Sequence, residues 1–335
     1  MTSVLIVVLN WNGIKDTEKC LPSLLSQTYD NFDIVVVDNG STDDSLKRLR
    51  LIEEKESKVT VLANKKNKGF DGGVNTGIRY GLEKKYDAIA LFNNDATADK
   101  NWLSELVDTL AGKKVGIATG LLLHANGKTI DSSGDWYSTW GLAYPRNRGH
   151  KTEMAPEGGE VFGASGGASL YKSAVFKEIG LFDESFFAYY EDVDISFRAQ
   201  LAGWKVIYNP KALAYHKQGA TSKKIPGLAL EKAFANLPQV YVKNVPKGLL
   251  WHIGSRFYLS HALFFWNAVR RGDGAPALKG TLKGIALTPG SLIKRRRIQK
   301  NRKVSIAYIK ESLWNDLPPD QTGMRKFRKI FTGKA

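Results

Sequence analysis

The feature that most constrains the fold is a series of short apolar runs, each followed at once by a cluster of Asn, Asp and Gly. The runs cover residues 3–9, 33–37, 59–62 and 88–92. Runs of this length that are rich in β-branched residues are typical of buried strands. Helical stretches separate them, at residues 17–26, 43–54 and 74–85. Alternating strands and helices predict an α/β fold whose mostly parallel sheet has helices on both faces.

The polar clusters come directly after the apolar runs, at residues 10–13, 38–43, 64–73 and 93–95. Each one alone would suit an ordinary turn. Ligands of open α/β sheets bind beyond the carboxyl ends of the strands, so four such clusters predict one binding edge. The glycines at 69–73 would let backbone approach a ligand, and the next helix would offer N–H groups to a diphosphate. Their spacing matches neither a P-loop nor the dinucleotide fingerprint. Ser41 is a candidate cap for the second helix.

Two aspartates on this edge are candidates for specific contacts. Asp38 could accept hydrogen bonds from a base or a ribose. Asp95, beside Asn94, could hold Mg²⁺ or Mn²⁺ through oxygen ligands. The alternative for Asp95 is a cap for a helix over residues 99–110.

A second polar cluster, at residues 189–194, precedes a predicted helix over 195–202. Glu191 and Asp192 are adjacent, so on a helix their side chains point about 100° apart and can serve different sites. The alternative is an acidic first turn that the helix dipole favours. Predicted strands at 205–208 and 212–215 lead to His216, which by itself would suit a structural role as well as a ligand role.

The charge of the chain divides it in two. The net charge is +16, yet residues 241–335 carry 20 Lys and Arg against four Asp and Glu, and the rest carries 29 of each. This shift predicts a domain over residues 1–240 and a basic helical region over 241–335. The single cysteine, Cys20, excludes a disulfide framework and a cysteine-based zinc site. The first residues are typical of a strand and not of a signal peptide, which indicates a cytoplasmic protein.

The basic region contains a 21-residue, mostly apolar segment at residues 249–269. Its length would permit a membrane span. Polar residues on one side and aromatic residues over much of the rest favour instead an amphipathic helix lying at an interface. With the basic clusters at 295–297 and 325–329, it predicts peripheral attachment to an anionic membrane surface. A helical appendage packed on the first domain is the alternative. Nucleic-acid binding is disfavoured, because no RNA- or DNA-binding motif accompanies the charge.

Six motifs in order along residues 3–222 resemble the family 2 glycosyltransferases, which are inverting, nucleotide-sugar-dependent enzymes of the GT-A fold. The motifs are VLNWNG, VVDNGSTDDS, NKGFDGGVNTGI, LFNNDA, GASGGASLYKS and YYEDVDISFRAQLAGWKVIYNPKALAYH. The resemblance is greatest to the rhamnosyltransferase-like bacterial branch, which builds cell-wall and surface polysaccharides.

The resemblance implies roles for individual residues. The nucleotide sugar would be contacted by Asn10, Asp38, Asn67, Gly69, Asn94 and Asp95. Asn93 replaces the first acid of the family's DXD motif, which leaves Asp95, with His216, to bind Mg²⁺ or Mn²⁺. Asp192 matches the general base. The acceptor side would be lined by Gly166, Gly167 and Glu191.

The resemblance also implies a function and a location. We expect transfer of a sugar, in the first place L-rhamnose from dTDP-L-rhamnose, to a glycan or lipid-linked glycan at the inner face of the cell membrane. A UDP-sugar donor is an alternative, since Asp38 could hydrogen-bond uracil and thymine alike. A non-catalytic module that binds nucleotide sugars or glycans is a second alternative, against which the joint presence of Asp95 and Asp192 argues. The aromatic helix at 249–269 would suit a homodimer contact as well as a membrane.

Overall fold

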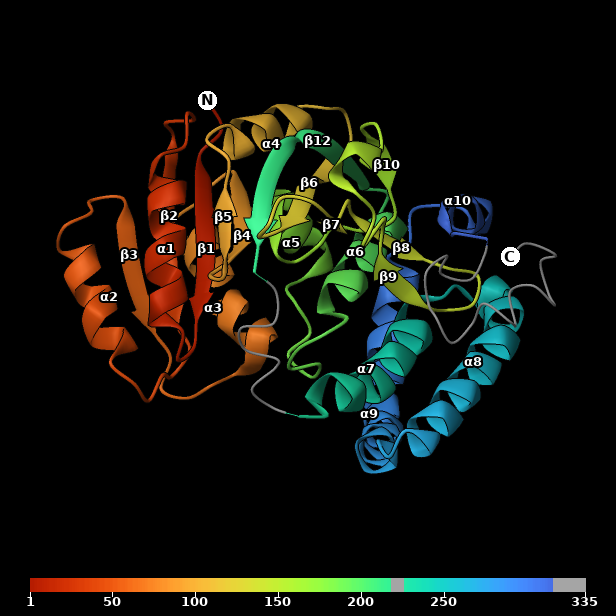
Figure 1. Ribbon diagram of the computed structural model, residues 1–335. Coiled ribbons are helices and arrows are strands. Elements are labelled where there is room, and N and C mark those ends of the chain that lie inside the picture. The colour runs from red at the N-terminus through yellow and green to blue at the C-terminus, as the bar shows by residue number, and fades with distance from the viewer. Residues whose placement is uncertain (218–225, 316–335) are drawn as a thin grey trace.

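The computed structural model describes residues 1–217 and 226–315, so the basic cluster at 325–329 lies outside the described residues (Figure 1). Residues 4–93 build a parallel sheet in the order β3-β2-β1-β4. Its strands are β1 (Val4–Asn10), β2 (Phe32–Asp38), β3 (Val59–Ala63) and β4 (Ala88–Asn93). The helices between them are α1 (Ile14–Leu25), α2 (Ser45–Glu53) and α3 (Gly69–Glu83). These strands and helices confirm the alternation predicted from the apolar runs.

Beyond β4 the sheet becomes mixed. β11 (Ala168–Lys172) lies antiparallel between β4 and β6 (Val115–His124), and β12 (Lys205–His216) runs parallel to β6. The two strands predicted at 205–208 and 212–215 are therefore one, with an irregular register between Asn209 and Leu213. Shorter strands complete the structure: β5 (Ala96–Ala98) and β10 (Gly159–Val161) on β12, β7 (Ile130–Ser132) on β6, and the hairpin β8 (Asp135–Tyr137) with β9 (Ala143–Pro145).

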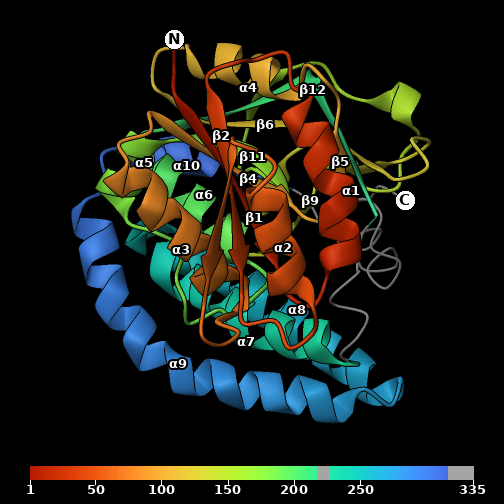
Figure 2. The ribbon, with the colours of Figure 1, turned by 90° about the vertical axis from the view of Figure 1, so that its left-hand side faces the viewer.

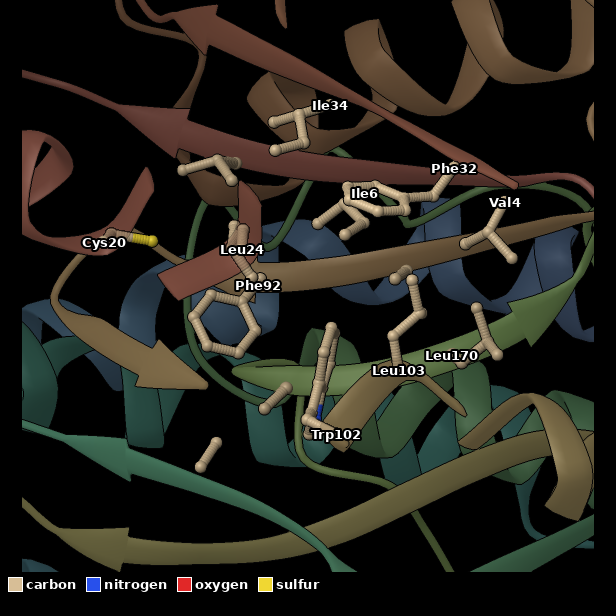
Figure 3. Close-up of a cluster of buried hydrophobic side chains, with 14 of the residues drawn as sticks. Val4, Ile6, Cys20, Leu24, Phe32, Ile34, Phe92, Trp102, Leu103 and Leu170 are labelled. Atoms are coloured by element: carbon tan, nitrogen blue, oxygen red, sulfur yellow. The ribbon is translucent and has the colours of Figure 1, made fainter. Parts of the chain in front are cut away.

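Each face of the sheet has its own hydrophobic core, because successive strand side chains point to opposite faces. One core joins the sheet to α1, α2 and α4 (Trp102–Leu110), with Trp102 packed edge-on against Phe92 at 4.8 Å between ring centroids (Figure 3). The other joins it to α3, α5 (Ser173–Ile179) and α6 (Glu191–Leu201). Helix α3 lies close to the sheet because three of its residues are glycines, at positions 73, 77 and 81. A Cβ at any of them would lie within 3.0 Å of a strand side chain, namely Leu9, Val7 or Ile89.

The C-terminal helices pack on this domain through a third core. They are α7 (Leu228–Asn244), α8 (Leu250–Arg270), α9 (Gly274–Lys300) and α10 (Ile306–Ser312). A short 3-10 turn, Lys247–Leu249, joins α7 to α8, and another, Thr152–Met154, lies between β9 and β10. The third core contains Phe197 of α6, Val240 of α7 and Phe257 of α8. The boundary expected at residue 240 falls inside α7. The shift in charge therefore does not coincide with a break in the fold.

Figure 2 shows α9 running along the outside of the molecule, with α7 between it and the sheet. The helix predicted at 249–269 is α8, but its buried side differs from the polar-versus-aromatic division expected for it. Ser260, a polar residue, is buried, whereas the aromatic residues Trp251 and Trp266 are 87% and 63% exposed. Within residues 1–217 and 226–315, no helix is both long enough and apolar enough to cross a membrane.

Candidate functional site

The carboxyl ends of β1 and β2 hold a closed group of polar side chains. Asn10 Nδ2 donates to Asp38 Oδ1 over 3.0 Å, and Ser41 Oγ donates to the same oxygen over 2.6 Å. Thr17 of α1 donates to Asn10 Oδ1. Asn10 and Asp38 are both buried, so they hold the loops of this edge together. The cap predicted at Ser41 is wrong, because its hydroxyl binds Asp38 and α2 begins only at Ser45.

Asn39, which sequence reasoning did not select, connects the second and third of these loops. Its Nδ2 donates to Asn67 Oδ1 over 3.1 Å and to the Gly69 carbonyl over 2.9 Å. Its Oδ1 accepts from Asn64 Nδ2 and from the Lys68 N–H. Asn39 is 1% exposed. The loop before α3 is therefore fixed by a buried amide, which satisfies backbone groups that water cannot reach.

The first N–H groups of α3 are used within the protein. Gly69 N–H donates to Asn67 Oδ1 over 2.8 Å, and Phe70 N–H donates to the Phe187 carbonyl over 2.6 Å. The sequence places the N–H groups for a diphosphate in a helix after the glycines at 69–73, whereas α3 already starts at Gly69 and its N–H groups at residues 69 and 70 have partners within the protein. Gly69 has φ +73°, and a Cβ there would lie 2.2 Å from the Phe187 carbonyl oxygen. A glycine is therefore required at position 69 because the start of α3 lies so close to the loop before α6.

At the end of β4, three polar side chains contact two partners, His216 and Thr17. Asn93 Nδ2 lies 3.3 Å from His216 Nε2, and Asn94 Nδ2 donates to Thr17 Oγ1 over 3.0 Å. Asp95 Oδ1 lies 3.0 Å from His216 Nε2. The pairing of β5 with the end of β12 produces this contact, because it places His216 opposite the residue after Asp95. The structure thus brings together the two residues expected to bind a metal.

Asp131 of β7 supports His216 from the other side of the ring. His216 Nδ1 lies 2.7 Å from Asp131 Oδ2, and Arg148 forms an ion pair with Asp131 at 2.9 Å. Burial by itself would lower the pKa of His216, but hydrogen bonds with Asp131 and Asp95 raise it to about 9. Burial opposes ionisation of Asp131, yet the hydrogen bond from His216 and the charge of Arg148 hold its pKa below the usual value.

The donor set of Asp95 and His216 fits a divalent cation. One carboxylate oxygen and one imidazole nitrogen lie 3.0 Å apart, and a carboxylate on the second ring nitrogen is the usual support of a histidine ligand. Among the described residues, no three or more His, Cys, Asp or Glu side chains form a group that could hold a metal. Asp95 and His216 would supply one carboxylate oxygen and one imidazole nitrogen, and phosphate oxygens and water would supply the remaining ligands.

Asp192 lies in the first turn of α6, where backbone N–H groups face its carboxylate. Its Oδ1 accepts from Val193 N–H over 2.8 Å, and its Oδ2 accepts from Gly166 N–H over 3.3 Å. Burial raises the pKa of Asp192, although these backbone hydrogen bonds oppose the shift. Burial, followed by the charges of Asp71 and Asp192, raises the pKa of Glu191 well above its usual value. Two adjacent acids with raised pKa values suit a site where one carboxylate accepts a proton from a sugar hydroxyl.

The segment at Gly166 and Gly167 joins the two halves of the site. Gly166 N–H donates to Asp192, and the Gly167 carbonyl accepts from Asn93 N–H over 2.8 Å. A Cβ on Gly167 would lie 3.0 Å from Asn93 Nδ2. Asp192 and the end of β4 are therefore connected through two adjacent glycines. The structure gathers the residues predicted for the base, the acceptor side and the metal around one segment of backbone.

The loop before Asp192 has an unusual backbone. Phe187, Tyr189 and Tyr190 have φ of 70°, 69° and 69°, in the left-handed region that costs a non-glycine residue free energy. Asn236 of α7 holds this loop: its Nδ2 contacts the carbonyls of residues 186, 188 and 189 at 3.1, 2.8 and 3.0 Å. Asn236 is fully buried. The helix that follows the sheet domain thus fixes the segment that carries the predicted base.

A buried ion network lies next to this loop. Lys243 of α7 contacts Asp183 at 2.5 Å and Asp194 at 2.8 Å, and Arg198 contacts Asp194 at 2.9 Å. Burial opposes ionisation of both aspartates, but the charge of Lys243, aided by hydrogen bonds at Asp183 and by the charge of Arg198 at Asp194, lowers the pKa of each. Lys294 of α9 adds a contact of 2.6 Å to Asp183. Helix α7 is therefore tied to α6 through Asp194, and both α7 and α9 are tied to the segment before α6 through Asp183.

Sequence reasoning did not select four residues that the structure places in or behind the site: Asn39, Asp131, Asn236 and Lys243. Asn39 stood within a polar strand-end cluster, which was a usable signal. The other three lie far along the chain from the groups they support, in segments without a polar cluster. Only the packing of β7 and α7 brings them to the site.

Comparison with known proteins gives a consistent picture. Residues 3–180 match the family model described as Glycosyl transferase family 2. N-acetylglucosaminyl-diphospho-decaprenol L-rhamnosyltransferase of Mycobacterium tuberculosis is 28% identical over 246 residues, covering 67% of this chain and 79% of that protein. The low-salt glycan biosynthesis hexosyltransferase Agl10 of Haloferax volcanii is 27% identical over 200 residues, covering 58% of this chain and 61% of that protein.

Two solved structures share the fold. The mannosyltransferase PcManGT from Pyrobaculum calidifontis, in complex with GDP-Man and Mn²⁺, superposes with a TM-score of 0.54 at 17% identity, over 93% of this chain and 87% of that one. TarS residues 1–349 of S. aureus superposes with a TM-score of 0.52 at 16% identity, over 89% and 90%. At these identities the likeness concerns the fold alone, and it confirms the predicted GT-A architecture with a helical C-terminal region.

Proposed function

The chain belongs to glycosyl transferase family 2, and from this membership we propose that it transfers a sugar from a nucleotide donor to an acceptor hydroxyl with inversion at the anomeric carbon. The observation that carries the proposal is the position of the two glycines at 166 and 167. They contact Asp192 on one side and the end of β4, beside Asp95, on the other. A base and a diphosphate site are needed on opposite sides of the anomeric carbon, and this segment lies between the candidates for both.

Asp192 is the general base of this reaction. As the acceptor oxygen forms its bond to the anomeric carbon, its proton passes to Asp192, and the bond to the diphosphate oxygen breaks with its electron pair. Burial raises the pKa of Asp192, which makes its carboxylate a stronger base. The N–H groups of Gly166 and Val193 orient the carboxylate and stabilise its charged form between turnovers.

Asp95 and His216 are the residues that would hold Mg²⁺ or Mn²⁺, with Asp131 fixing the imidazole. Such a cation neutralises the charge that develops on the leaving diphosphate. A histidine that binds a metal must have a lone pair on the binding nitrogen. The Asp131 carboxylate accepts Nδ1–H and would thereby leave the Nε2 lone pair for the cation. Asn94, hydrogen-bonded to Thr17, would line the donor beside this pair.

The donor that we propose is dTDP-L-rhamnose, and the acceptor a glycan linked to a lipid diphosphate. The support is the printed activity of the mycobacterial relative, which is an L-rhamnosyltransferase acting on N-acetylglucosaminyl-diphospho-decaprenol. A UDP-sugar donor is the second candidate, because the fold is shared with an enzyme bound to UDP, GalNAc and Mn²⁺. Asn10, Asp38, Asn67 and Gly69 would shape the nucleotide pocket from the carboxyl ends of the strands.

The test is transfer measured with a panel of nucleotide sugars in the presence of Mg²⁺ or Mn²⁺. We expect turnover with dTDP-L-rhamnose, loss of transfer in Asp192→Asn, and donor affinity by calorimetry that stays near the wild-type value. Asp30→Asn, an exposed carboxylate just before β2 and so at the opposite end of the strand from the polar clusters, is the matched control and should retain activity. Full transfer by Asp192→Asn, or a loss of donor affinity as large as the loss of rate, would refute the assignment of the base. Binding without turnover of any donor would support a non-catalytic module instead.

A further inference from the structure

Helix α9 is oriented with its large apolar side chains outward. The side that packs against α7 consists of small residues: Ala277, Gly280, Gly284 and Ser291 are all buried. A Cβ on Gly280 would lie 2.2 Å from the Glu231 carbonyl oxygen. The two helices therefore approach each other so closely that only small side chains fit between them, and the bulk of the apolar residues of α9 lies elsewhere.

The opposite side of α9 is an exposed apolar stripe. Leu278, Leu282, Ile285, Leu292 and Ile293 are 50%, 59%, 64%, 50% and 69% exposed. At 100° per residue these five positions fall within about 100° of one another, centred roughly opposite the buried small residues. A surface helix normally buries its apolar stripe against the core. Here the stripe faces solvent over four turns, which marks an interaction surface.

Helix α8 extends this surface with aromatic side chains. Trp251, Tyr258, Trp266 and Val269 are 87%, 60%, 63% and 45% exposed and lie along one side of the helix. Its other side is buried in the third core, through residues such as Phe257. Helices α8 and α9 contact each other and lie at the end of the molecule away from β1–β3 (Figure 1). We call the exposed apolar residues of these two helices the α8–α9 surface.

The positive charge around the α8–α9 surface indicates which kind of partner it binds. Residues 250–300 contain ten Lys and Arg and a single acidic residue, Asp273. Exposed members include Arg270, Arg271, Arg296 and Lys300, at the ends of the two helices. Two copies of such a surface would repel each other. Apolar side chains framed by cations, with tryptophans among them, are complementary to a bilayer that carries anionic headgroups.

We propose that the α8–α9 surface is the site at which the protein docks on a lipid bilayer with anionic headgroups, α8 and α9 lying along the membrane plane. The exposed apolar side chains enter the region between headgroups and acyl chains, and the basic residues contact the headgroups. Because α7 and α9 are tied to the loop before α6 through Lys243 and Lys294, the docked protein would hold its candidate site at a constant position relative to the bilayer.

The test uses the full chain and vesicles of phosphatidylcholine with or without phosphatidylglycerol, without donor or acceptor. Its result is therefore independent of whether the protein transfers a sugar. We expect co-sedimentation with the anionic vesicles only, weakened by salt, with a blue shift of tryptophan fluorescence as Trp251 and Trp266 leave water. The double variant Leu282→Glu, Ile285→Glu should lower vesicle affinity by roughly tenfold or more. Both side chains are exposed, so the variant should fold like the wild type.

Leu51→Glu is the matched control, because Leu51 is a 48% exposed leucine on α2, remote from the α8–α9 surface. It should bind vesicles like the wild type. The proposal is overturned if the wild type does not bind anionic vesicles, or if the double variant binds them as tightly as the control. It is also overturned if light scattering shows a dimer that the double variant converts to monomer, since the occupant would then be a second copy of the chain.

Discussion

Replacement of Asn236 by alanine tests whether α7 positions the base of the reaction from outside the sheet domain. The Asn236 amide holds three carbonyls of the loop at residues 186–189, at 2.8–3.1 Å. Its removal costs about 0.5–1.5 kcal/mol for each net hydrogen bond. Three loop residues have left-handed φ, which costs on the order of 1 kcal/mol each. The free energy that these hydrogen bonds contribute is similar to the cost of the left-handed backbone. Without Asn236 the loop can therefore relax to an unstrained conformation, and Asp192 would move with it.

The expected result is a fall in kcat by about tenfold to a hundredfold, which corresponds to roughly 1.4–2.7 kcal/mol in the barrier. KM for the nucleotide donor should change little, because the polar group at the ends of β1 and β2 does not depend on Asn236. The assay is steady-state transfer with the donor that the panel identifies, together with a thermal unfolding curve for each variant.

Gln239→Ala is the control for a merely structural effect. Gln239 is one turn away on α7, fully buried, and donates its amide to the Gly284 carbonyl of α9 over 2.8 Å. Its loss should lower the unfolding temperature in the same way as Asn236→Ala but leave kcat near the wild-type value. The reasoning is refuted if Asn236→Ala keeps full kcat, or if Gln239→Ala lowers kcat as much.

Three further predictions follow from the buried polar groups. Lys243→Met should reduce the free energy of unfolding, measured by urea denaturation, by about 3–5 kcal/mol. The reason is that the buried Asp194 carboxylate would lose one of its two cationic partners. An unchanged urea midpoint would contradict this. The folded-state pKa of Asp194 lies below its unfolded value, so its contribution to stability is present above about pH 4 and is lost as the pH falls further. Urea midpoints between pH 6 and pH 3 should decline less steeply in Asp194→Asn than in the wild type. Asp131→Asn should weaken Mn²⁺ binding by about 10–100-fold in electron paramagnetic resonance titrations with nucleoside diphosphate; unchanged affinity would show that Asp131 does not support the histidine ligand.

Local sequence was sufficient for the strands of the first domain. The run at residues 3–9 became Val4–Asn10, and that at 88–92 became Ala88–Asn93. Strands buried on both faces must be apolar over their whole length, so they can be read directly from the chain. The polar clusters after them did meet at one edge, because parallel strands end on the same side of a sheet.

Helix starts were less predictable. α3 begins at Gly69 and not near residue 74, because the Phe187 carbonyl accepts the N–H of Phe70 and extends the helix toward its N-terminus. Glycine in a first turn has no local preference that would reveal this. The partner of that N–H lies more than a hundred residues along the chain, and only the folded chain supplies it.

The basic region shows a similar limit. Its composition indicated a helical segment with an affinity for anionic surfaces. A helical wheel of α8 did not indicate which side is buried, because the core beneath it accepts Ser260 together with Phe257. The sequence does not show that the large apolar residues of α9 are exposed, because this depends on the packing of its small residues against α7.

The amino-acid sequence by itself determined the α/β alternation, the binding edge and the acidic cluster at residues 191–194, since each is encoded in residues that are neighbours along the chain. Tertiary structure decided which of these act together. The pairing of β5 with β12 places His216 against Asp95, the glycines at 166 and 167 join Asp192 to β4, and α7 fixes the loop before Asp192. These contacts span large separations in sequence, and their strength comes from burial and close packing, which no local pattern records.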